Sequence, residues 1–152
     1  MVVLVTGAGG QLGQSLQFIA KKYPEINFVF CDSKKLDITN KFAAEAVFNK
    51  TKPDFCINAA AYTAVDKAEV EYEKANLINV TGPKNLAEIC KHHNAILLHV
   101  STDFVFDGIK KTPYKEIDNT NPNGVYGQTK LDGELAIQAI WNKHFIIRTS
   151  WV

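Results

Sequence analysis

The sequence carries little net charge, no long hydrophobic run and no basic leader. Its 17 Lys and Arg side chains nearly balance 16 Asp and Glu side chains, leaving a formal charge of +1. No overall field therefore exists that would attract nucleic acid or an anionic membrane surface. Apolar stretches such as residues 95–98 fall far short of the roughly 20 residues that a membrane-spanning helix needs. Met1 leads directly into an apolar segment, which predicts a cytoplasmic protein without a signal peptide or membrane anchor.

Cysteines are few and odd in number. Cys31, Cys56 and Cys90 are scattered through apolar segments, where a cysteine usually serves as a small buried hydrophobic residue. Three cysteines at such spacing do not form the paired framework of a disulfide protein or the ligand pattern of a zinc site. We expect no disulfide, metal or catalytic role for them.

The remaining composition is that of one ordinary globular domain. Hydrophobic residues make up 46% of the 152 residues and charged residues 22%. Short apolar runs alternate with helix-like segments, which predicts an α/β fold: a Rossmann-like, doubly wound parallel sheet with helices on both faces. The expected strands are 2–5, 27–31, 55–58, 96–101 and 145–148, and the expected helices are 12–22, 41–50, 68–91 and 126–140.

Two segments depart from this regular alternation. Gly82-Pro83 lies inside the third expected helix and predicts a break or a kink, because proline lacks the donor that a helix interior uses. Residues 107–124 are rich in Asp, Asn, Gly and Pro, and they predict a long surface loop. Loops of this length within a compact domain are often functional.

A glycine-rich turn follows the first expected strand. Gly7, Gly10 and Gly13, with Gln11 and Leu12 between them, stand where the chain must turn from strand to helix. Glycine allows the backbone to approach a pyrophosphate closely, and the start of a helix offers free N–H groups and the positive end of a dipole. This context predicts a dinucleotide-binding loop. The spacing G-x-x-G-x-x-G is similar to that of the short-chain dehydrogenase/reductase superfamily.

The choice between NADH and NADPH stays open. Asp32 follows the second strand, about 20 residues beyond the loop, where a carboxylate can accept hydrogen bonds from the ribose hydroxyls of NAD(H). Lys34 and Lys35 stand beside it, and either could pair with the 2′-phosphate of NADP(H). Asp37 and the residues after it could simply form the turn before a helix that is capped by Thr39 or Asn40.

A tyrosine and a lysine are spaced for one face of a helix. Tyr126 and Lys130 are four residues apart, so both can reach a common ligand. The expected strand 96–101 delivers Thr102 to the carboxyl edge of the sheet, where ligands gather in open parallel sheets. We expect Lys130 to lower the pKa of Tyr126, Tyr126 to supply the proton for carbonyl reduction, and Thr102 to hydrogen-bond the substrate oxygen.

Four segments together resemble the successive signatures of the dTDP-4-dehydrorhamnose reductase family, within the extended short-chain dehydrogenase/reductase superfamily. The resemblance covers the whole chain in the family's order. The segments are residues 58–69, 101–108, 125–130 and 148–152.

The resemblance implies NAD(P)H-dependent reduction of the 4-keto group of a dTDP-linked deoxysugar, from dTDP-4-dehydrorhamnose to dTDP-rhamnose, for polysaccharide biosynthesis. It makes Tyr126 the proton donor and Lys130 its partner on the cofactor ribose. Further cofactor contacts would be Asp37 and Ile38 on the adenine ring, with Ala61, Tyr62, Thr63 and Val100. Residues near the sugar would be Thr102, Asp103 and Trp151.

Two departures from the family bear on these expectations. Family enzymes are much longer, and their later part, absent from this chain, holds much of the sugar-nucleotide pocket. Residues 1–152 would then be the NAD(P)-binding domain, which alone could bind cofactor without turnover. Some members form a magnesium-linked dimer through a glutamate after the glycine loop, whereas Gln14 and Ser15 stand here. We expect no metal at that place, and a homodimer stays open for the full-length protein.

Other functions compete with reduction. Sugar-nucleotide dehydratases carry an acidic pair after the threonine, but here Asp103 is followed by Phe104, which favours reduction over elimination. Epimerases lack such a pair too and remain an alternative. A non-catalytic alternative is a dinucleotide-binding regulatory subunit, similar to that of methionine adenosyltransferase. Intact Tyr126 and Lys130 favour the enzyme.

Overall fold

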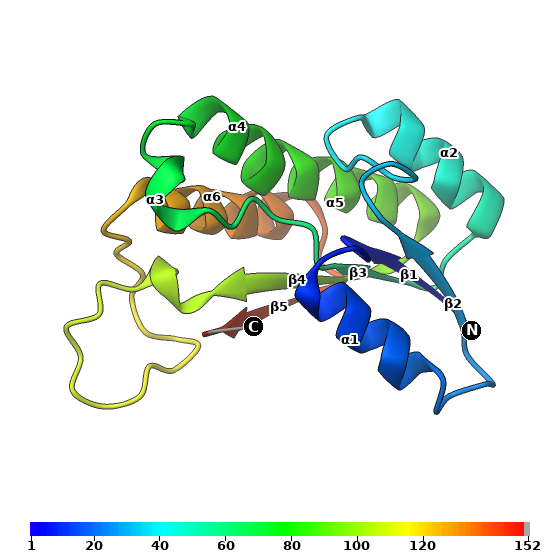
Figure 1. Cartoon of the computed structure of the whole chain (residues 1–152), viewed down its shortest axis with the longest axis horizontal. Helices are drawn as coiled ribbons and strands as arrows, with labels where there is room; N and C mark the ends of the chain where they lie inside the picture. The colour runs from blue at the N-terminus through cyan, green and yellow to red at the C-terminus, as the bar shows by residue number, and fades with distance from the viewer. Residues whose placement is uncertain (151–152) are drawn as a thin grey trace.

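The chain forms a five-stranded parallel sheet with helices on both faces, as the sequence predicts. The computed structural model describes residues 1–150. The strand order is β2-β1-β3-β4-β5, and every neighbouring pair is parallel. Figure 1 shows α1 on one face of this sheet and the other labelled helices on the opposite face. The strands are β1 (Val2–Thr6), β2 (Asn27–Cys31), β3 (Phe55–Asn58), β4 (Ile96–Thr102) and β5 (His144–Thr149).

Each expected helix has a counterpart. The helices are α1 (Gln11–Ala20), α2 (Lys41–Thr51), α3 (Val65–Ala68), α4 (Tyr72–Asn76), α5 (Gly82–His93) and α6 (Val125–Ile140). Asn40 caps α2, because its side-chain oxygen accepts a hydrogen bond of 3.1 Å from the backbone N–H of Ala43. The turn predicted before α2 is therefore confirmed.

The segment around Gly82-Pro83 changes its hydrogen bonding without leaving the helix. After α4, residues Leu77–Thr81 form a π-helical segment, η1, and α5 starts at Gly82 with Pro83 in its first turn. Pro83 has no backbone N–H to donate, and it stands directly after the segment in which the regular α-helical hydrogen bonding is already interrupted. The predicted distortion is thus a π-segment, a feature that is rare in proteins and frequent at functional sites.

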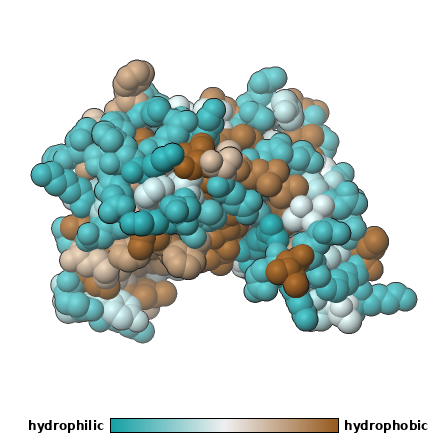
Figure 2. Space-filling view, turned by 180° about the vertical axis from the view of Figure 1, so that it is seen from behind, coloured by the Kyte–Doolittle hydropathy of each residue, from teal (hydrophilic) through white to brown (hydrophobic). Residues whose placement is uncertain are grey.

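The core lies mainly between the sheet and the face that carries α2, α5 and α6. Alternate β4 side chains point into it, while Phe145 and Ile147 on β5 point to the opposite face and are 61% and 48% exposed. In the view from behind, the lower edge of the molecule is hollowed between two lobes, with apolar side chains above the hollow (Figure 2). Cys31, Cys56 and Cys90 are buried and unpaired, as expected. Residues 1–150 contain no helix long and apolar enough to cross a membrane.

Helix α6 packs against η1 at backbone distance. A Cβ placed on Gly133 would lie 2.1 Å from the carbonyl oxygen of Asn79. Only glycine fits there unless one of the two segments moves. This contact fixes the position of α6 over the carboxyl end of β4.

We predict that Gly133→Ala destabilises the protein by about 1–3 kcal/mol, the usual effect of overpacking. At a helix position without such a contact, Gly→Ala stabilises the protein by about 1 kcal/mol. Whether the variant is destabilised or stabilised therefore tests the contact. Urea unfolding of the full-length protein measures it. Leu135→Ala, at a half-exposed position of the same helix, is the control and should change stability much less. A stabilised Gly133→Ala variant would contradict the tight contact.

Candidate active site

The glycine-rich turn joins β1 to α1 as predicted. Gly7 has a φ of +67°, a conformation that glycine adopts readily, and the N–H of Gly10 donates to the carbonyl of Gly7 at 3.0 Å. Gly10 precedes the first residue of α1, and no described side chain caps this helix start. The N–H groups of the first turn are therefore free to bind an anion such as a pyrophosphate.

Asp32 lies next to this turn. A Cβ on Gly9 would be 3.8 Å from the Cβ of Asp32. One carboxylate oxygen, Oδ1, accepts the backbone N–H groups of Lys34 and Lys35 at 3.1 and 3.0 Å. These bonds hold the carboxylate at the end of β2 and place both lysine side chains on the surface beside it. The carboxylate expected to favour NAD(H) and the two lysines expected to favour NADP(H) therefore both lie at the end of β2.

Asp37 and Ile38 serve the turn that leads into α2. The carboxylate of Asp37 accepts the backbone N–H and the hydroxyl of Thr39 at 2.9 and 2.7 Å. Ile38 is only 4% exposed and packs against Gly82, and its carbonyl accepts a hydrogen bond from Asn85. The adenine contacts expected of Asp37 and Ile38 stay predictions.

The residues after β3 are held by a side chain that sequence reasoning missed. Asn79, in η1, accepts the N–H of Tyr62 at 2.9 Å and donates to the carbonyl of Tyr62 at 3.1 Å. The same amide donates to the hydroxyl of Thr129 on α6 at 3.2 Å. Asn79 therefore fixes the segment of Ala61, Tyr62 and Thr63 relative to the helix that carries Tyr126. No sequence pattern pointed to Asn79, because its partners are 17 and 50 residues away.

Thr102 and Tyr126 meet at the carboxyl end of β4. Thr102 ends this strand, and its hydroxyl accepts the N–H of Phe104 at 3.2 Å. Burial raises the pKa of Tyr126, the charge of Asp103 adds to the rise, and a hydrogen bond with Thr102 opposes it. The ring of Phe104 packs edge-on against Tyr126, with centroids 5.5 Å apart. The phenol is therefore positioned and protonated at neutral pH.

Lys130 is buried and points toward the strand below it. Its Nζ donates to the carbonyl of Val100 at 2.7 Å, and the residue is 2% exposed. Burial lowers the pKa of Lys130 to about 8, against the opposing attraction of the Glu134 carboxylate. We expected Lys130 to lower the pKa of Tyr126, and that expectation is wrong for this structure. The ammonium lies on Val100, and the pKa of Tyr126 is raised.

A buried ion pair, also missed in the sequence, ties α6 to the ends of two strands. The carboxylate of Glu134 accepts hydrogen bonds from the Ser101 hydroxyl and from two nitrogens of Arg148, the shorter of these at 2.6 Å. Its side chain is 1% exposed. At its other end, α6 is held by Glu69, whose carboxylate accepts the N–H of Val125 at 2.8 Å. Tyr126 and Lys130 thus lie on the part of α6 between these two anchoring contacts, at Val125 and Glu134.

Two cavities lie beside Asp103. One cavity, of about 410 Å³, is lined by Tyr126, Phe104, Asp103 and the first residues of the 107–124 loop. A second, of about 750 Å³, is lined by Asp103, Tyr114, Arg148 and residues near the end of β5. Asp103 borders both cavities, and its expected place near the sugar stays a prediction. Trp151, the other expected sugar contact, lies outside the described residues.

We predict that burial of the Lys130 cation gives the protein a characteristic pH dependence. Its pKa is about 8 in the folded state against an ordinary 10.5, so the unfolded chain binds more protons between these values, and stability rises with pH across that window. Relative to Lys130→Met, the free energy of unfolding should rise by about 2–3 kcal/mol between pH 7 and pH 10, at about 1.4 kcal/mol per unit. Urea unfolding of both proteins measures this difference, and a pH-independent difference would contradict the burial.

Comparison with known proteins gives one family. The model described as the RmlD substrate binding domain matches residues 1–152. Over 149 residues the chain is 46% identical to the dTDP-4-dehydrorhamnose reductase of Aggregatibacter actinomycetemcomitans, which covers 98% of the chain and 51% of that protein. It is 43% identical over 157 residues to the enzyme of that name from Escherichia coli K12, covering 100% of the chain and 52% of that protein. The chain thus spans about half the length of these curated relatives.

Solved structures agree with this result. A dTDP-4-dehydrorhamnose reductase from Clostridium acetobutylicum superposes with a TM-score of 0.95 at 46% identity, over 99% of the chain and 54% of that structure. The reductase of Bacillus anthracis, solved in complex with NADP, superposes with a TM-score of 0.94 at 41% identity. This match covers 99% of the chain and 53% of that structure. The chain therefore belongs to the family described as the RmlD substrate binding domain, and these relatives carry the name dTDP-4-dehydrorhamnose reductase.

Proposed function

We propose that the full-length protein reduces dTDP-4-dehydrorhamnose to dTDP-rhamnose with NAD(P)H. The observation that carries this proposal is the meeting of Thr102, Tyr126 and Lys130 at the carboxyl end of β4, on the sheet edge that also carries the glycine turn. The names of the relatives support the substrate. The proposal extends to a cytoplasmic enzyme of polysaccharide biosynthesis, and a homodimer stays open for the full-length protein.

The residues of this site suit reduction of a ketone. The nicotinamide supplies a hydride to the carbonyl carbon, and the carbonyl oxygen becomes an alkoxide that needs one proton. Tyr126 gives that proton from its phenol, which its raised pKa keeps protonated at neutral pH. The Thr102 hydroxyl donates to the Asp103 carboxylate at 3.2 Å in this structure, and turned toward a bound ketone it would donate to the same oxygen and fix its direction. Lys130 offers a cation beside the Val100 carbonyl, close to where the cofactor ribose is proposed to bind.

The site contains a carboxylate suited to NADH and lysines suited to NADPH. The two turn hydrogen bonds of Asp32 use Oδ1 of its carboxylate, so a ribose diol can donate to the other oxygen, as in NADH. The surface lysines beside it suit a 2′-phosphate, and the Bacillus anthracis relative was solved with NADP. We propose that the enzyme accepts NADPH and NADH, and that Lys34 and Lys35 favour NADPH.

The other functions have less support. A regulatory subunit needs the glycine turn but no proton donor, whereas here Tyr126 is positioned by Thr102 and Phe104. An epimerase of nucleotide sugars would use the same fold. An assay of the full-length protein separates them, because only a reductase oxidises NAD(P)H when dTDP-4-dehydrorhamnose is added.

We predict that Gly10→Val abolishes tight NAD(P)H binding but leaves stability nearly unchanged. A Cβ on Gly10 meets only the Gly7 oxygen, at 3.4 Å, so its side chain projects to where the pyrophosphate is proposed to bind. Gly13→Ala is the matched control. Its Cβ would lie 2.4 Å from the Gly7 oxygen, so this variant should mainly lose stability. Fluorescence titration and thermal unfolding measure both, and identical titration curves for Gly10→Val and the parent would refute the role of the turn.

We predict that Tyr126→Phe lowers turnover by about a hundred- to ten-thousand-fold, the usual worth of general acid catalysis, with NAD(P)H affinity nearly unchanged. Lys130→Met should lower NAD(P)H affinity, because Lys130 is assigned to the cofactor ribose. Tyr23→Phe, at an exposed tyrosine, is the control and should match the parent. The measurement is NAD(P)H absorbance with dTDP-4-dehydrorhamnose. Parental turnover in Tyr126→Phe would mean that another group supplies the proton.

A further inference from the structure

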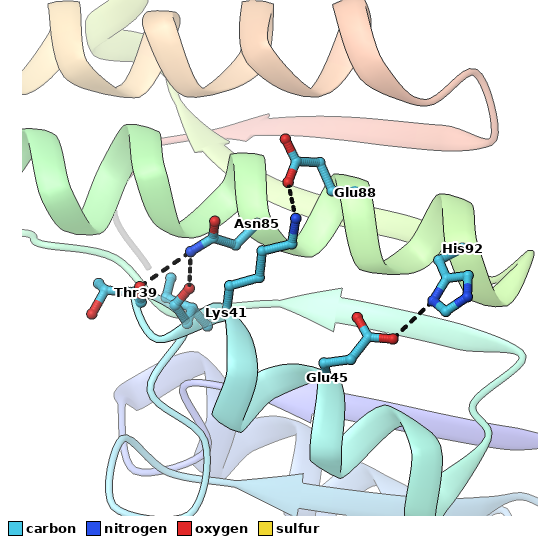
Figure 3. A network of polar contacts seen from close by, with 7 residues as sticks. Thr39, Lys41, Glu45, Asn85, Glu88 and His92 are labelled. Carbon is cyan, nitrogen blue, oxygen red and sulfur yellow. Dashed lines mark hydrogen bonds and ion pairs between the residues drawn. The ribbon is translucent and has the colours of Figure 1, made fainter.

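Three side chains of the kinds that bind transition metals converge away from the candidate active site. Glu45 comes from α2, and His92 and His93 come from the last turn of α5. One carboxylate oxygen, Oε1 of Glu45, lies 2.8 Å from Nδ1 of His92 and 2.8 Å from Nε2 of His93. One ligand atom from each of the three residues lies within 4.8 Å of the other two. Figure 3 shows the Glu45 carboxylate and the His92 ring pointing toward each other across the two helices.

The surroundings hold this cluster on one side and leave it open on the other. The His93 side chain is 15% exposed and packs on the ring of Phe48, whose centroid is 5.5 Å away. The Glu45 side chain is 27% exposed, whereas that of His92 is 74% exposed. The two imidazole rings meet edge to face, with centroids 4.9 Å apart. An ion bound here would therefore have two partly buried ligands, one surface ligand and room for water.

The cluster has the chemistry of a site for a borderline divalent cation. Two imidazole nitrogens and one carboxylate oxygen form a set that holds Zn²⁺ with a fourth position open, at about 2.0–2.2 Å from each ligand. Tetrahedral ligands at such lengths are about 3.4 Å apart, so the two 2.8 Å contacts need to open only slightly.

We propose that Glu45, His92 and His93 form a surface site for Zn²⁺ or a similar transition-metal ion that joins α2 to α5. The seam between these helices already carries the ion pair Lys41–Glu88 at 2.6 Å. At its other end, Asn85 donates to the carbonyls of Ile38 and Thr39 at 3.0 and 3.2 Å (Figure 3). A bound ion would add a third link between α2 and α5. Because the ion would bind the folded state and not the unfolded chain, it would also stabilise the folded protein.

The test is titration of the full-length protein, without a histidine tag, with ZnCl₂ in a calorimeter. The parent should bind one equivalent that Glu45→Gln, His92→Ala and His93→Ala each weaken by about tenfold or more, since even indirect partners of a metal change affinity by roughly 10- to 100-fold. His144→Gln removes a histidine outside the cluster, and Lys91→Ala changes the neighbouring position on α5. Both controls should keep the parental affinity.

Two further measurements distinguish a metal site from three residues that only hydrogen-bond to one another. Added Zn²⁺ should raise the melting temperature of the parent and not that of His93→Ala, whose own fold is checked by its melting curve in chelator. With Co²⁺, the parent should show the strong visible absorption of a four- or five-coordinate ion, and His93→Ala should lose it. Zn²⁺ affinity that is absent in the parent, or equal in the parent and all three ligand variants, would overturn the proposal. The three residues would then only connect α2 and α5 by hydrogen bonds.

Discussion

The close approach of α6 to the π-helical segment η1 is the constraint on which the candidate site depends. Gly133 lets the two backbones meet, because any side chain at that position would overlap the Asn79 carbonyl. At this distance the Asn79 amide reaches both Thr129 on α6 and the backbone of Tyr62 after β3. One side chain thereby sets the spacing between the segment proposed to line the cofactor and the helix that carries the proton donor. A looser contact would leave these two parts of the site free to move separately.

Buried charge then fixes the orientation of α6. Glu134 and Arg148 form an ion pair whose carboxylate also accepts from Ser101, and Lys130 is buried one turn away beneath Val100. Burial, with the charge of Lys130, lowers the pKa of His99 on the same strand, so this histidine adds no second cation. Removing one partner of such a set leaves an uncompensated buried charge, which costs about 3–5 kcal/mol. The helix therefore has one favourable position over β4, and the site is preorganised rather than assembled by its ligand.

The sequence predicted those parts of the molecule whose determinants are local. Apolar runs and turn residues located all five strands and the longer helices but not the short α3, and the glycine turn was found because strand, turn and helix follow each other within a few residues. Asn79 and Glu134 escaped because their importance comes from partners brought near by the fold. The spacing of Tyr126 and Lys130 correctly placed both on one helix, yet it could not show that the Val100 carbonyl takes the ammonium. For that reason the predicted direction of the Tyr126 pKa was wrong.

That error changes the chemistry assigned to the tyrosine. A lysine that lowered the phenol's pKa would favour the phenolate, which is the form needed to remove a proton from an alcohol. A buried phenol beside Asp103, with its pKa raised, instead holds its proton at neutral pH and can give it to an alkoxide. Asp103 also borders both cavities, so a ligand that displaced water from this carboxylate would strengthen its effect on Tyr126. A phenol that keeps its proton at this place is what the proposed role of Tyr126 as proton donor requires.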